Sequence, residues 1–161
     1  MAKPPRDRAS TSSNTYFVTA GTWKGCALFQ SERVAKLFVE TLFNYRGQKK
    51  IQVHEFVVMP NHFHILLTPE TGVTLERAMQ LLRGGFSYRA GKELGIHGEI
   101  WQRGYVDHRV RDAADHVHHR DYIRLNPVRA NLVGVPEEYP YSSAHPSFEL
   151  DPVPQGLKPR V

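Results

Sequence analysis

Two histidines stand one residue apart in an otherwise apolar run, within VVMPNHFHILLTP at residues 57–69. Side chains alternate between the two faces of a strand, so His62 and His64 point one way and Phe63 points the other way. Two neutral imidazoles on one face suit a divalent metal ion. The alternative is a pair of hydrogen-bonded histidines on a half-buried strand. The spacing therefore predicts a metal site on one face of this strand and a core residue on the other.

A second polar pair occurs in DYIRLNPVRANLV, residues 121–133. Tyr122 and Asn126 are four residues apart, so a helix would place them on one face, where both can address the same point. We expect Leu125, which lies between them, to face the core. A tyrosine on an amphipathic helix is usually a packing residue with its hydroxyl at the rim. Spacing alone therefore leaves Tyr122 open to a packing role or a chemical role.

Basic and aromatic residues alternate in the segment between these two pairs. From Arg77 to Arg111 seven basic residues stand against three acidic ones, so the chain's net charge of +5 is concentrated here. Guanidinium groups contact phosphates and aromatic rings stack on unpaired bases, which suits single-stranded nucleic acid or hairpin tips. A solvated basic surface is the alternative. The residues expected to contact nucleic acid are Arg83, Tyr88, Arg89, Trp101, Arg103, Tyr105 and Arg109.

Other residues in and near this segment have competing interpretations. Core packing is the alternative for Phe86 and Trp101. The remaining histidines near the end of the segment could suggest a second metal site, and they are His108, His116, His118 and His119. We interpret the HVHH run as part of an exposed helix without carboxylate partners. These histidines are therefore assigned to the surface or to a nucleic-acid contact.

Apolar periodicity predicts the elements that must position these residues. A strand is expected at Tyr16–Ala20, followed by a helix that Ser31 caps and that ends near Gly47. The histidine strand forms a hairpin with the preceding run IQVHEFVVM, because Pro60 and Asn61 signal a tight turn. The first half of the chain is thus predicted to be strand, helix, strand and strand.

The second half is predicted to contain a helix, a strand and a helix. Thr74 caps a helix that stops around Gly84–Gly85, and a strand or strand pair begins at Glu99. Asp112 caps the third helix, which is expected to end at about Asn126, since the residue before a proline avoids helical backbone. This order predicts an α+β fold with a ferredoxin-like, mostly antiparallel sheet and packed helices.

Composition limits the class of protein. The 161 residues suffice for one domain, expected at residues 15–145 between a disordered basic tail (1–14) and a loose, proline-rich tail (146–161). The single cysteine, Cys26, allows neither an intramolecular disulfide nor a thiolate metal site, which favours the cytoplasm. No apolar run is long enough for a membrane span, and the polar N-terminus is unlike a signal peptide. We therefore expect no association with membranes.

These motifs resemble those of the single-tyrosine HUH transposases, in which U is a hydrophobic residue, and among them the REP-associated tyrosine transposases of the IS200-like family. The HFH of residues 62–64 is similar to the HUH motif and is preceded, as in that family, by VVMPN. The resemblance continues through LERAMQLLRGGFSYRAG, WQRGYVDHRVRD, YIRLNPVRANLV and YPYSSA, and covers roughly residues 15–145. HUH alone is a weak signal, but HUH followed by YIRLNPVRA in this order is specific.

The resemblance implies an HUH endonuclease fold and a metal-dependent enzyme that cuts and rejoins hairpin-flanked, single-stranded DNA through a 5′-phosphotyrosine. On this chain it makes Tyr122 the nucleophile, His62 and His64 metal ligands, and Asn126 the residue that completes the ligand set. Relatives in the wider family carry Gln at the last position. The ion is expected to be Mg²⁺ or Mn²⁺, and the imidazoles favour Mn²⁺. The resemblance leaves monomer and homodimer open and implies association with the nucleoid.

Other classes of protein fit the residues less well. A histidine-triad nucleotide hydrolase needs a third alternating histidine, but Leu66 occupies that position. Relaxases usually place the tyrosine before the HUH motif, and many replication initiators carry two tyrosines on one helix, where this chain has Asn126. The alternative within the family is a domesticated protein that binds hairpin or repeat DNA without transposition activity. Retention of Tyr122 and Asn126 together with the histidine pair argues against a decayed active site.

Overall fold

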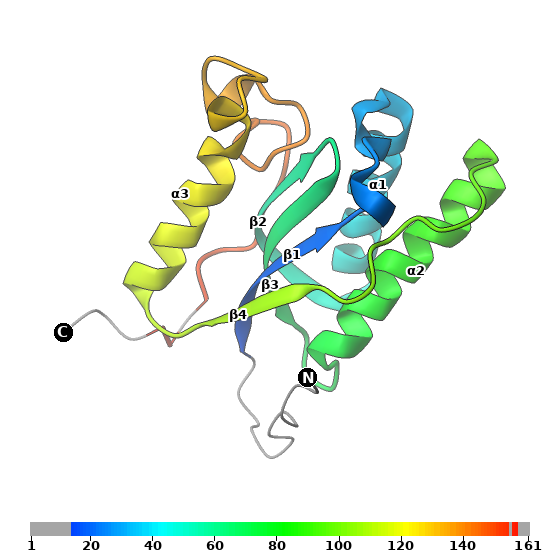
Figure 1. The fold of residues 1–161 in the computed structure, drawn as a ribbon. Coiled ribbons are helices and arrows are strands. Elements are labelled where there is room, and N and C mark those ends of the chain that lie inside the picture. Colours follow the sequence, from blue (N-terminus) through cyan, green and yellow to red (C-terminus); the bar gives the residue numbers. More distant parts are fainter. Residues whose placement is uncertain (1–13, 155, 158–161) are drawn as a thin grey trace.

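In the computed structural model, which describes residues 14–154, 156 and 157, four strands form an antiparallel sheet with helices on both of its faces (Figure 1). The strands are β1 (Thr15–Gly21), β2 (Ile51–Met59), β3 (His62–Pro69) and β4 (Val106–Val110). The helices are α1 (Glu32–Gly47), α2 (Leu75–Leu94) and α3 (Ala113–Arg129), with short 3-10 turns η1 (Trp23–Gly25), η2 (Leu28–Gln30) and η3 (Pro136–Glu138). The N-terminal tail predicted at residues 1–14 lies outside the described residues, except for residue 14.

The order of the strands in the sheet is β2-β3-β1-β4. Combined with the chain order β1-α1-β2-β3-α2-β4, this is the ferredoxin-like arrangement, with β1 and β3 in the centre. β1 pairs antiparallel with both β3 and β4, and β2 and β3 form the predicted hairpin. The predicted α+β fold is therefore confirmed, and α3 follows the last strand as expected.

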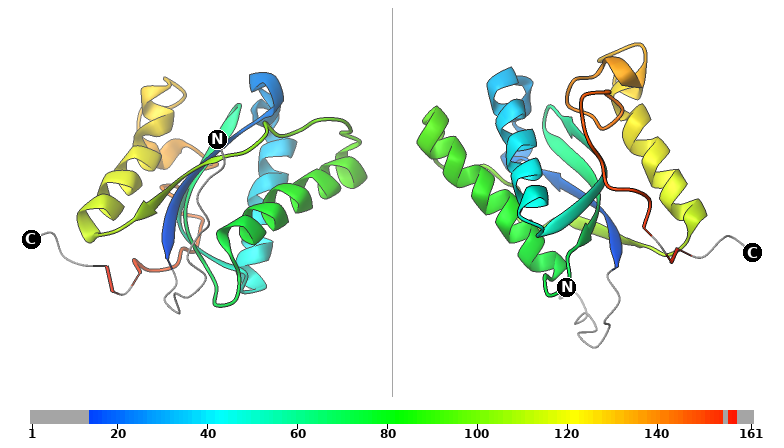
Figure 2. Two further views of the ribbon diagram at one scale, coloured as in Figure 1. Left: turned by 60° about the horizontal axis from the view of Figure 1, so that its bottom comes forward. Right: turned by 180° about the vertical axis from the view of Figure 1, so that it is seen from behind.

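Helices lie on both faces of the sheet (Figure 2), and the two faces carry separate hydrophobic clusters. α1 and α2 cover one face, where Phe38, Phe63 and Phe86 are fully buried. α3 lies over the other face, where Ile123 packs in one cluster with Leu66 of β3. Within the part of the chain that the structure describes, no helix combines the length and hydropathy that crossing a bilayer requires.

α2 continues through the two glycines at which it was predicted to stop. It runs to Leu94 and ends at Gly95, whose φ of 69° is left-handed. The apolar face persists beyond the glycines, because Phe86 and Ala90 are both buried. Gly85 is needed for packing: a Cβ at this position would lie 2.3 Å from the hydroxyl oxygen of Tyr45 in α1. The glycine therefore marks a close contact between two helices rather than the end of one.

α3 likewise continues past the proline at which it was predicted to end. Pro127 is buried inside the helix, and the last turn closes with a hydrogen bond of 3.1 Å from Ala130 N–H to the Asn126 carbonyl. The expectation for Leu125 is also wrong, because this residue is 37% exposed and Ile123 is fully buried. Ile123 and Pro127 are four residues apart and share the sheet-facing side, which turns Leu125 outward.

The last strand is shorter than predicted. The segment expected to be extended from residue 99 contributes only β4, and before it Trp101 forms an isolated bridge with Thr22. The N–H of Gln102 donates to the Gly21 carbonyl at 2.9 Å. Because Gly21 pairs with His62 in the sheet, β1 lies between the loop before β4 and the first histidine of β3.

The C-terminal segment is packed rather than loose up to residue 151. Phe148 stacks on Phe43 of α1, with ring centroids 5.4 Å apart. The Asp151 carboxylate accepts hydrogen bonds from Arg46 at 2.9 Å and from the Val53 backbone at 2.7 Å. Proline-rich composition did not prevent these two side chains from joining the core and the edge of β2. Residues 155 and 158–161 of the predicted tail lie outside the described residues.

Candidate active site

β3 begins with the histidine pair, and the register of the sheet determines which way it points. His62 pairs with Gly21 and His64 with Thr19, both in β1. The two imidazole centroids lie 4.8 Å apart on the face that α3 covers. Phe63 is fully buried on the opposite face, under α1 and α2. The predicted faces of this strand are therefore confirmed.

Hydrogen bonds hold the Nδ1 atom of each imidazole. His62 Nδ1 is 2.7 Å from Asn61 Oδ1, an atom that only accepts, so Nδ1 carries the proton. His64 Nδ1 is 2.8 Å from Thr19 Oγ1. His64 Nε2 is buried and has no hydrogen-bond partner among the described residues. An imidazole that donates through one nitrogen and keeps a lone pair on the other suits a metal ion.

Both imidazoles are held in their neutral form. Burial, and then the neighbouring His62, lower the pKa of His64 from 6.5 to about 3. Burial also lowers the pKa of His62. A neutral imidazole is the form that binds a metal ion. The pair therefore fits a divalent ion held through the two Nε2 atoms.

Tyr122 projects from α3 toward His64. Its ring centroid lies 5.3 Å from that of His64 and 5.9 Å from that of Phe17, which meets it edge-on. The residue is 38% exposed, so molecules in solution can reach it. Asn126 follows one turn later on the same helix and is half-buried. The fold thus brings the tyrosine to the histidine pair from a distant part of the sequence.

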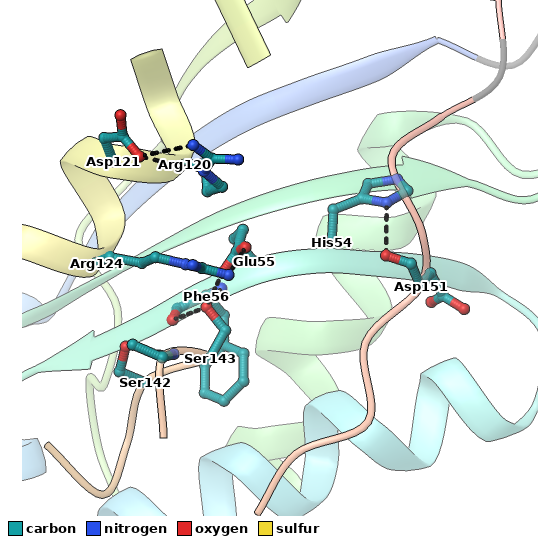
Figure 3. A network of polar contacts seen from close by, with 10 residues as sticks. His54, Glu55, Phe56, Arg120, Asp121, Arg124, Ser142, Ser143 and Asp151 are labelled. Carbon is teal, nitrogen blue, oxygen red and sulfur yellow. Dashed lines mark hydrogen bonds and ion pairs between the residues drawn. The ribbon is translucent and has the colours of Figure 1, made fainter. Parts of the chain in front are cut away.

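A polar network anchors α3 beside this site (Figure 3). Arg124 Nη2 donates to the carboxylate of Glu55 in β2 at 2.7 Å. Ser143, in the C-terminal segment, donates to the same carboxylate. Arg124 stands between Tyr122 and Asn126 in the sequence. The ion pair therefore holds the helical turn that carries both residues.

A β-bulge in β2 points a further histidine toward α3. The register with β3 shifts between Val53 and Glu55, so His54 lies outside the regular alternation. Its ring lies 5.9 Å from that of His116, which is buried against it. Burial, and then His54, lower the pKa of His116 to about 4. The expectation that His116 lies on the surface is therefore wrong, because this side of α3 faces the sheet.

A carboxylate joins two of the remaining histidines. His108 Nε2 is 2.8 Å from Asp115 Oδ2, and His119 Nδ1 is 3.1 Å from Asp115 Oδ1. The expectation that these histidines lack a carboxylate partner is therefore wrong. Asp115 stands four residues before His119, so helical spacing alone would have placed the two on one face. His118 is exposed, as predicted.

Some of the residues expected to contact nucleic acid surround one hollow. It measures about 440 Å³ and lies between α2 and the loop before β4. The expected residues that line it are Arg83, Trp101, Arg103 and Tyr105. The Arg83 guanidinium lies 5.3 Å from the ring centroid of Tyr105 and donates to the Gly104 carbonyl at 2.9 Å. Cationic and aromatic groups therefore converge at this place.

The other three expected residues do not line this hollow. Tyr88 is 68% exposed on α2, and Arg109 is exposed on β4. Arg89 pairs with Glu93 at 2.6 Å and with Glu40 at 3.2 Å. Two carboxylates thus already occupy the Arg89 guanidinium, whereas Tyr88 and Arg109 are accessible to a ligand.

Phe86 and Trp101, for which core packing was the alternative interpretation, both pack in the core. Phe86 is fully buried. The Trp101 ring centroid lies 5.5 Å from those of Phe86 and Phe63, and its indole N–H donates to the Arg83 carbonyl at 3.0 Å. Trp101 therefore contributes a wall to the hollow while most of its contacts are with the core.

Residues 15–126 match the family model described as transposase IS200 like. The REP-associated tyrosine transposase of Escherichia coli strain K12 is 25% identical over 137 residues, which cover 81% of this chain and 80% of that protein. A putative REP-associated tyrosine transposase of Haemophilus influenzae strain Rd is 31% identical over 108 residues, or 61% of each chain.

Two solved structures share the fold. The structure of a REP-associated tyrosine transposase bound to a REP hairpin has a TM-score of 0.73 at 20% identity, and covers 100% of this chain and 99% of that one. A putative transposase from Deinococcus radiodurans has a TM-score of 0.53 at 19% identity, and covers 74% of this chain and 95% of that one. At these identities the likeness concerns the fold.

Proposed function

Because the chain belongs to the IS200-like transposase family, we propose that it cuts and rejoins hairpin-flanked, single-stranded DNA, with Tyr122 as the nucleophile. The observation that carries the proposal is the contact between the Tyr122 ring and His64, whose Nε2 is buried and unpaired. The solved transposase with a REP hairpin supports a hairpin as the substrate, since its fold is similar.

The proposed reaction exchanges one phosphoester for another. The Tyr122 hydroxyl oxygen attacks the scissile phosphorus, a bond to the 5′ phosphate forms, and the bond to the 3′ oxygen breaks. The phenol loses its proton and the departing oxygen gains one, which yields a 5′-phosphotyrosine and a free 3′-hydroxyl. Attack of a 3′-hydroxyl on this intermediate rejoins the strand without consuming an external energy source.

His62 and His64 would hold a divalent ion through their Nε2 atoms, and Asn126 is proposed as the third ligand. When bound, Mg²⁺ or Mn²⁺ supplies Lewis-acid polarisation of the phosphate, and imidazole ligands favour Mn²⁺. Thr19 and Asn61 orient the two rings, since they hold the Nδ1 atoms. Arg124 keeps the tyrosine in place through Glu55.

The hollow beside α2 is proposed as the binding site for the unpaired strand. The loop that lines it hydrogen-bonds to Gly21, which pairs with His62, but α2 covers the sheet face opposite to the histidine pair. A DNA strand would therefore have to pass around the sheet to reach the hollow from the histidine pair. Arg83 and Arg103 would contact phosphates, and Tyr105 would stack on a base. Tyr88 and Arg109 are proposed as outer contacts. Arg89 would first have to leave its acidic partners.

Tyr122→Phe tests the proposal, because it removes only the hydroxyl. We expect the variant to bind single-stranded hairpin DNA as the wild type does and to form no covalent adduct on a denaturing gel. Tyr88→Phe makes the same change at a proposed outer contact on α2, where phenylalanine keeps the ring that could stack on a base, and this variant should retain the adduct if Tyr122 is the nucleophile. An adduct that persists in Tyr122→Phe would assign the nucleophile to another tyrosine, such as Tyr105 or Tyr88.

A further inference from the structure

We propose that His108, Asp115 and His119 form a second site for a first-row divalent cation of the Zn²⁺ type, separate from the histidine pair of β3. His108 lies on β4, whereas Asp115 and His119 lie on α3. One ligand atom from each residue can be chosen so that all three atoms lie within 4.8 Å of one another. The inference does not depend on the proposed reaction, because it rests on these three side chains alone.

The fold brings the three ligand atoms together from two elements. Asp115 and His119 are four residues apart and share one side of α3. His108 pairs with Phe17 of β1, and this register turns its imidazole toward the sheet face on which α3 lies. Two different carboxylate oxygens of Asp115 lie 2.8 Å and 3.1 Å from the imidazole nitrogens of His108 and His119, and one ligand atom from each residue lies within 4.8 Å of the others, whereas neighbouring ligands of a tetrahedral zinc ion lie about 3.4 Å apart. The two imidazole rings are stacked with centroids 4.9 Å apart, and His119 Nδ1 lies 2.8 Å from the Asp115 backbone carbonyl, so both rings would have to turn toward a bound ion.

The donor set determines which ions are expected. Two imidazoles and a carboxylate form a common zinc ligand set that leaves one position for water. Mg²⁺ prefers oxygen ligands and should bind weakly here. The His108 side chain is 50% exposed, whereas those of Asp115 and His119 are 24% and 14% exposed, so an ion can enter from the His108 side.

A bound ion would fasten the start of α3 to the edge strand β4. The Phe17 ring contacts both His119, at 4.5 Å between centroids, and Tyr122, at 5.9 Å. Tyr122 follows His119 by three residues on the same helix. Occupancy of this site would therefore steady the segment that carries Tyr122. The competing possibility is a hydrogen-bonded cluster without an ion, in which His108 Nε2 donates to the Asp115 carboxylate and His119 Nδ1 donates to the Asp115 backbone carbonyl.

The test uses the double variant His62→Ala/His64→Ala of the full chain, so that the β3 pair no longer binds metal. Zn²⁺ is titrated by calorimetry, and Co²⁺ is titrated to follow the d–d absorption of its complex. We expect one equivalent of Zn²⁺ to bind, a Co²⁺ spectrum typical of mixed nitrogen and oxygen ligands, and a higher melting temperature with Zn²⁺ than with a chelator. Mg²⁺ at the same concentration should have no effect. Failure of the double variant to bind Zn²⁺ would overturn the proposal.

Two further substitutions in this background assign the ligands. Asp115→Asn and His108→Gln should each weaken Zn²⁺ binding at least tenfold, whereas His118→Gln, which alters an exposed histidine beside the cluster, should leave it unchanged. Melting curves in chelator show whether each variant folds. If Asp115→Asn does not fold, Zn²⁺ binding by His108→Gln tests the site, because the half-exposed His108 side chain can be replaced with little effect on folding. Undiminished binding in the folded ligand variants, or loss of binding in His118→Gln, would place the ion elsewhere and refute the site.

Discussion

The residues around His64 suit the proposed metal ion. Thr19 engages Nδ1, burial and His62 keep the ring neutral, and Nε2 has no partner among the described residues. An unpaired polar atom in a buried position destabilises the fold unless a ligand or water satisfies it. The cost of leaving Nε2 unpaired is therefore consistent with a functional role for this nitrogen.

The opposite faces of β3 predict opposite effects of substitution. Phe63→Ala should lower the free energy of unfolding by about 3 to 5 kcal/mol, because a fully buried ring is lost from the core. His62→Ala and His64→Ala should cost less stability and abolish metal-dependent cleavage. Chemical denaturation and a cleavage assay with added Mn²⁺ measure both effects. A harmless Phe63→Ala combined with an unfolded His62→Ala would reverse the assignment of faces.

The lowered pKa of His54 predicts part of the dependence of the free energy of unfolding on pH. Burial lowers its pKa in the folded protein, against the opposing effect of backbone hydrogen bonds to Asp151 and Pro152. The unfolded chain therefore binds a proton that the folded chain does not, and the free energy of unfolding falls as pH drops below the unfolded pKa of about 6.5. His54→Gln should reduce this fall.

Urea denaturation at about pH 7.5 and at about pH 5 brackets that unfolded pKa. The difference in free energy between the two conditions should be smaller in His54→Gln than in the wild type. His116 contributes in the same direction in both proteins, since its own pKa is lowered to about 4. His118→Gln, on the exposed side of α3, should leave the difference unchanged. A pH dependence in His54→Gln as steep as that of the wild type would contradict this role for His54.

At the scale of elements, the contact between α1 and α2 depends on one of two adjacent glycines. A Cβ at Gly85 would lie 2.3 Å from the Tyr45 hydroxyl, whereas a Cβ at Gly84 would have no neighbour within 4 Å. Gly84→Ala should therefore raise the free energy of unfolding by about 0.5 to 1 kcal/mol through helix propensity. Gly85→Ala should lower it, because the rigid Tyr45 ring must move. Thermal melts of the two variants measure these changes in stability. An equal gain in stability for both variants would show that the contact between Gly85 and Tyr45 is loose.

α3 is attached to the sheet by polar as well as apolar contacts. Ile123 packs over β3, and Arg124 reaches the Glu55 carboxylate on β2. The Glu55 side chain is only 5% exposed, so its charge requires the partner that Arg124 provides. This attachment keeps Tyr122 beside the histidine strand while leaving its ring accessible. The bulge at His54 contributes, since it turns Glu55 toward the helix.

For the whole molecule, the hollow and the histidine pair predict a preference for unpaired DNA. Hairpins with single-stranded flanks should be bound and cut, whereas a perfect duplex of the same sequence should resist, because stacking on Tyr105 requires a base that is already unstacked. Gel-shift and cleavage assays compare the two substrates. Binding should weaken steeply with salt, since arginine contacts to phosphates release counterions. Equal cutting of the perfect duplex would contradict the proposed substrate.

The polarity of the proposed intermediate is a separate prediction. A tyrosine that takes the 5′ phosphate keeps the downstream part of the strand. A label at the 3′ end should therefore migrate with the protein on a denaturing gel, and a label at the 5′ end should appear in a free fragment that ends in a 3′-hydroxyl. Substrates labelled at each end provide matched controls for one another. The reverse pattern would refute the proposed chemistry even if cleavage required a metal ion.

Local features of this protein were predictable from sequence because they depend on neighbouring residues. The alternation around Phe63 correctly separated the core face of β3 from the histidine face. Thr74 and Asp112 cap α2 and α3 as predicted, with hydrogen bonds of 3.1 Å and 2.7 Å from backbone N–H groups. The order of the elements was sufficient for the ferredoxin-like arrangement, which follows from short connections and antiparallel pairing.

Non-local features required the tertiary structure. The two glycines of α2 predicted a helix end, because only their local propensity is visible in the sequence. In the fold Gly85 instead contacts Tyr45 on another helix. The spacing of four residues could have placed Asp115 and His119 on one side of a helix, but only the register of β4 against β1 turns His108 toward α3. The contact between Tyr122 and His64 depends on how α3 packs across the sheet. The sequence by itself thus determined which residues share a face, and the packing of elements decided which faces meet, because burial and electrostatic pairing act between segments that are distant in the chain.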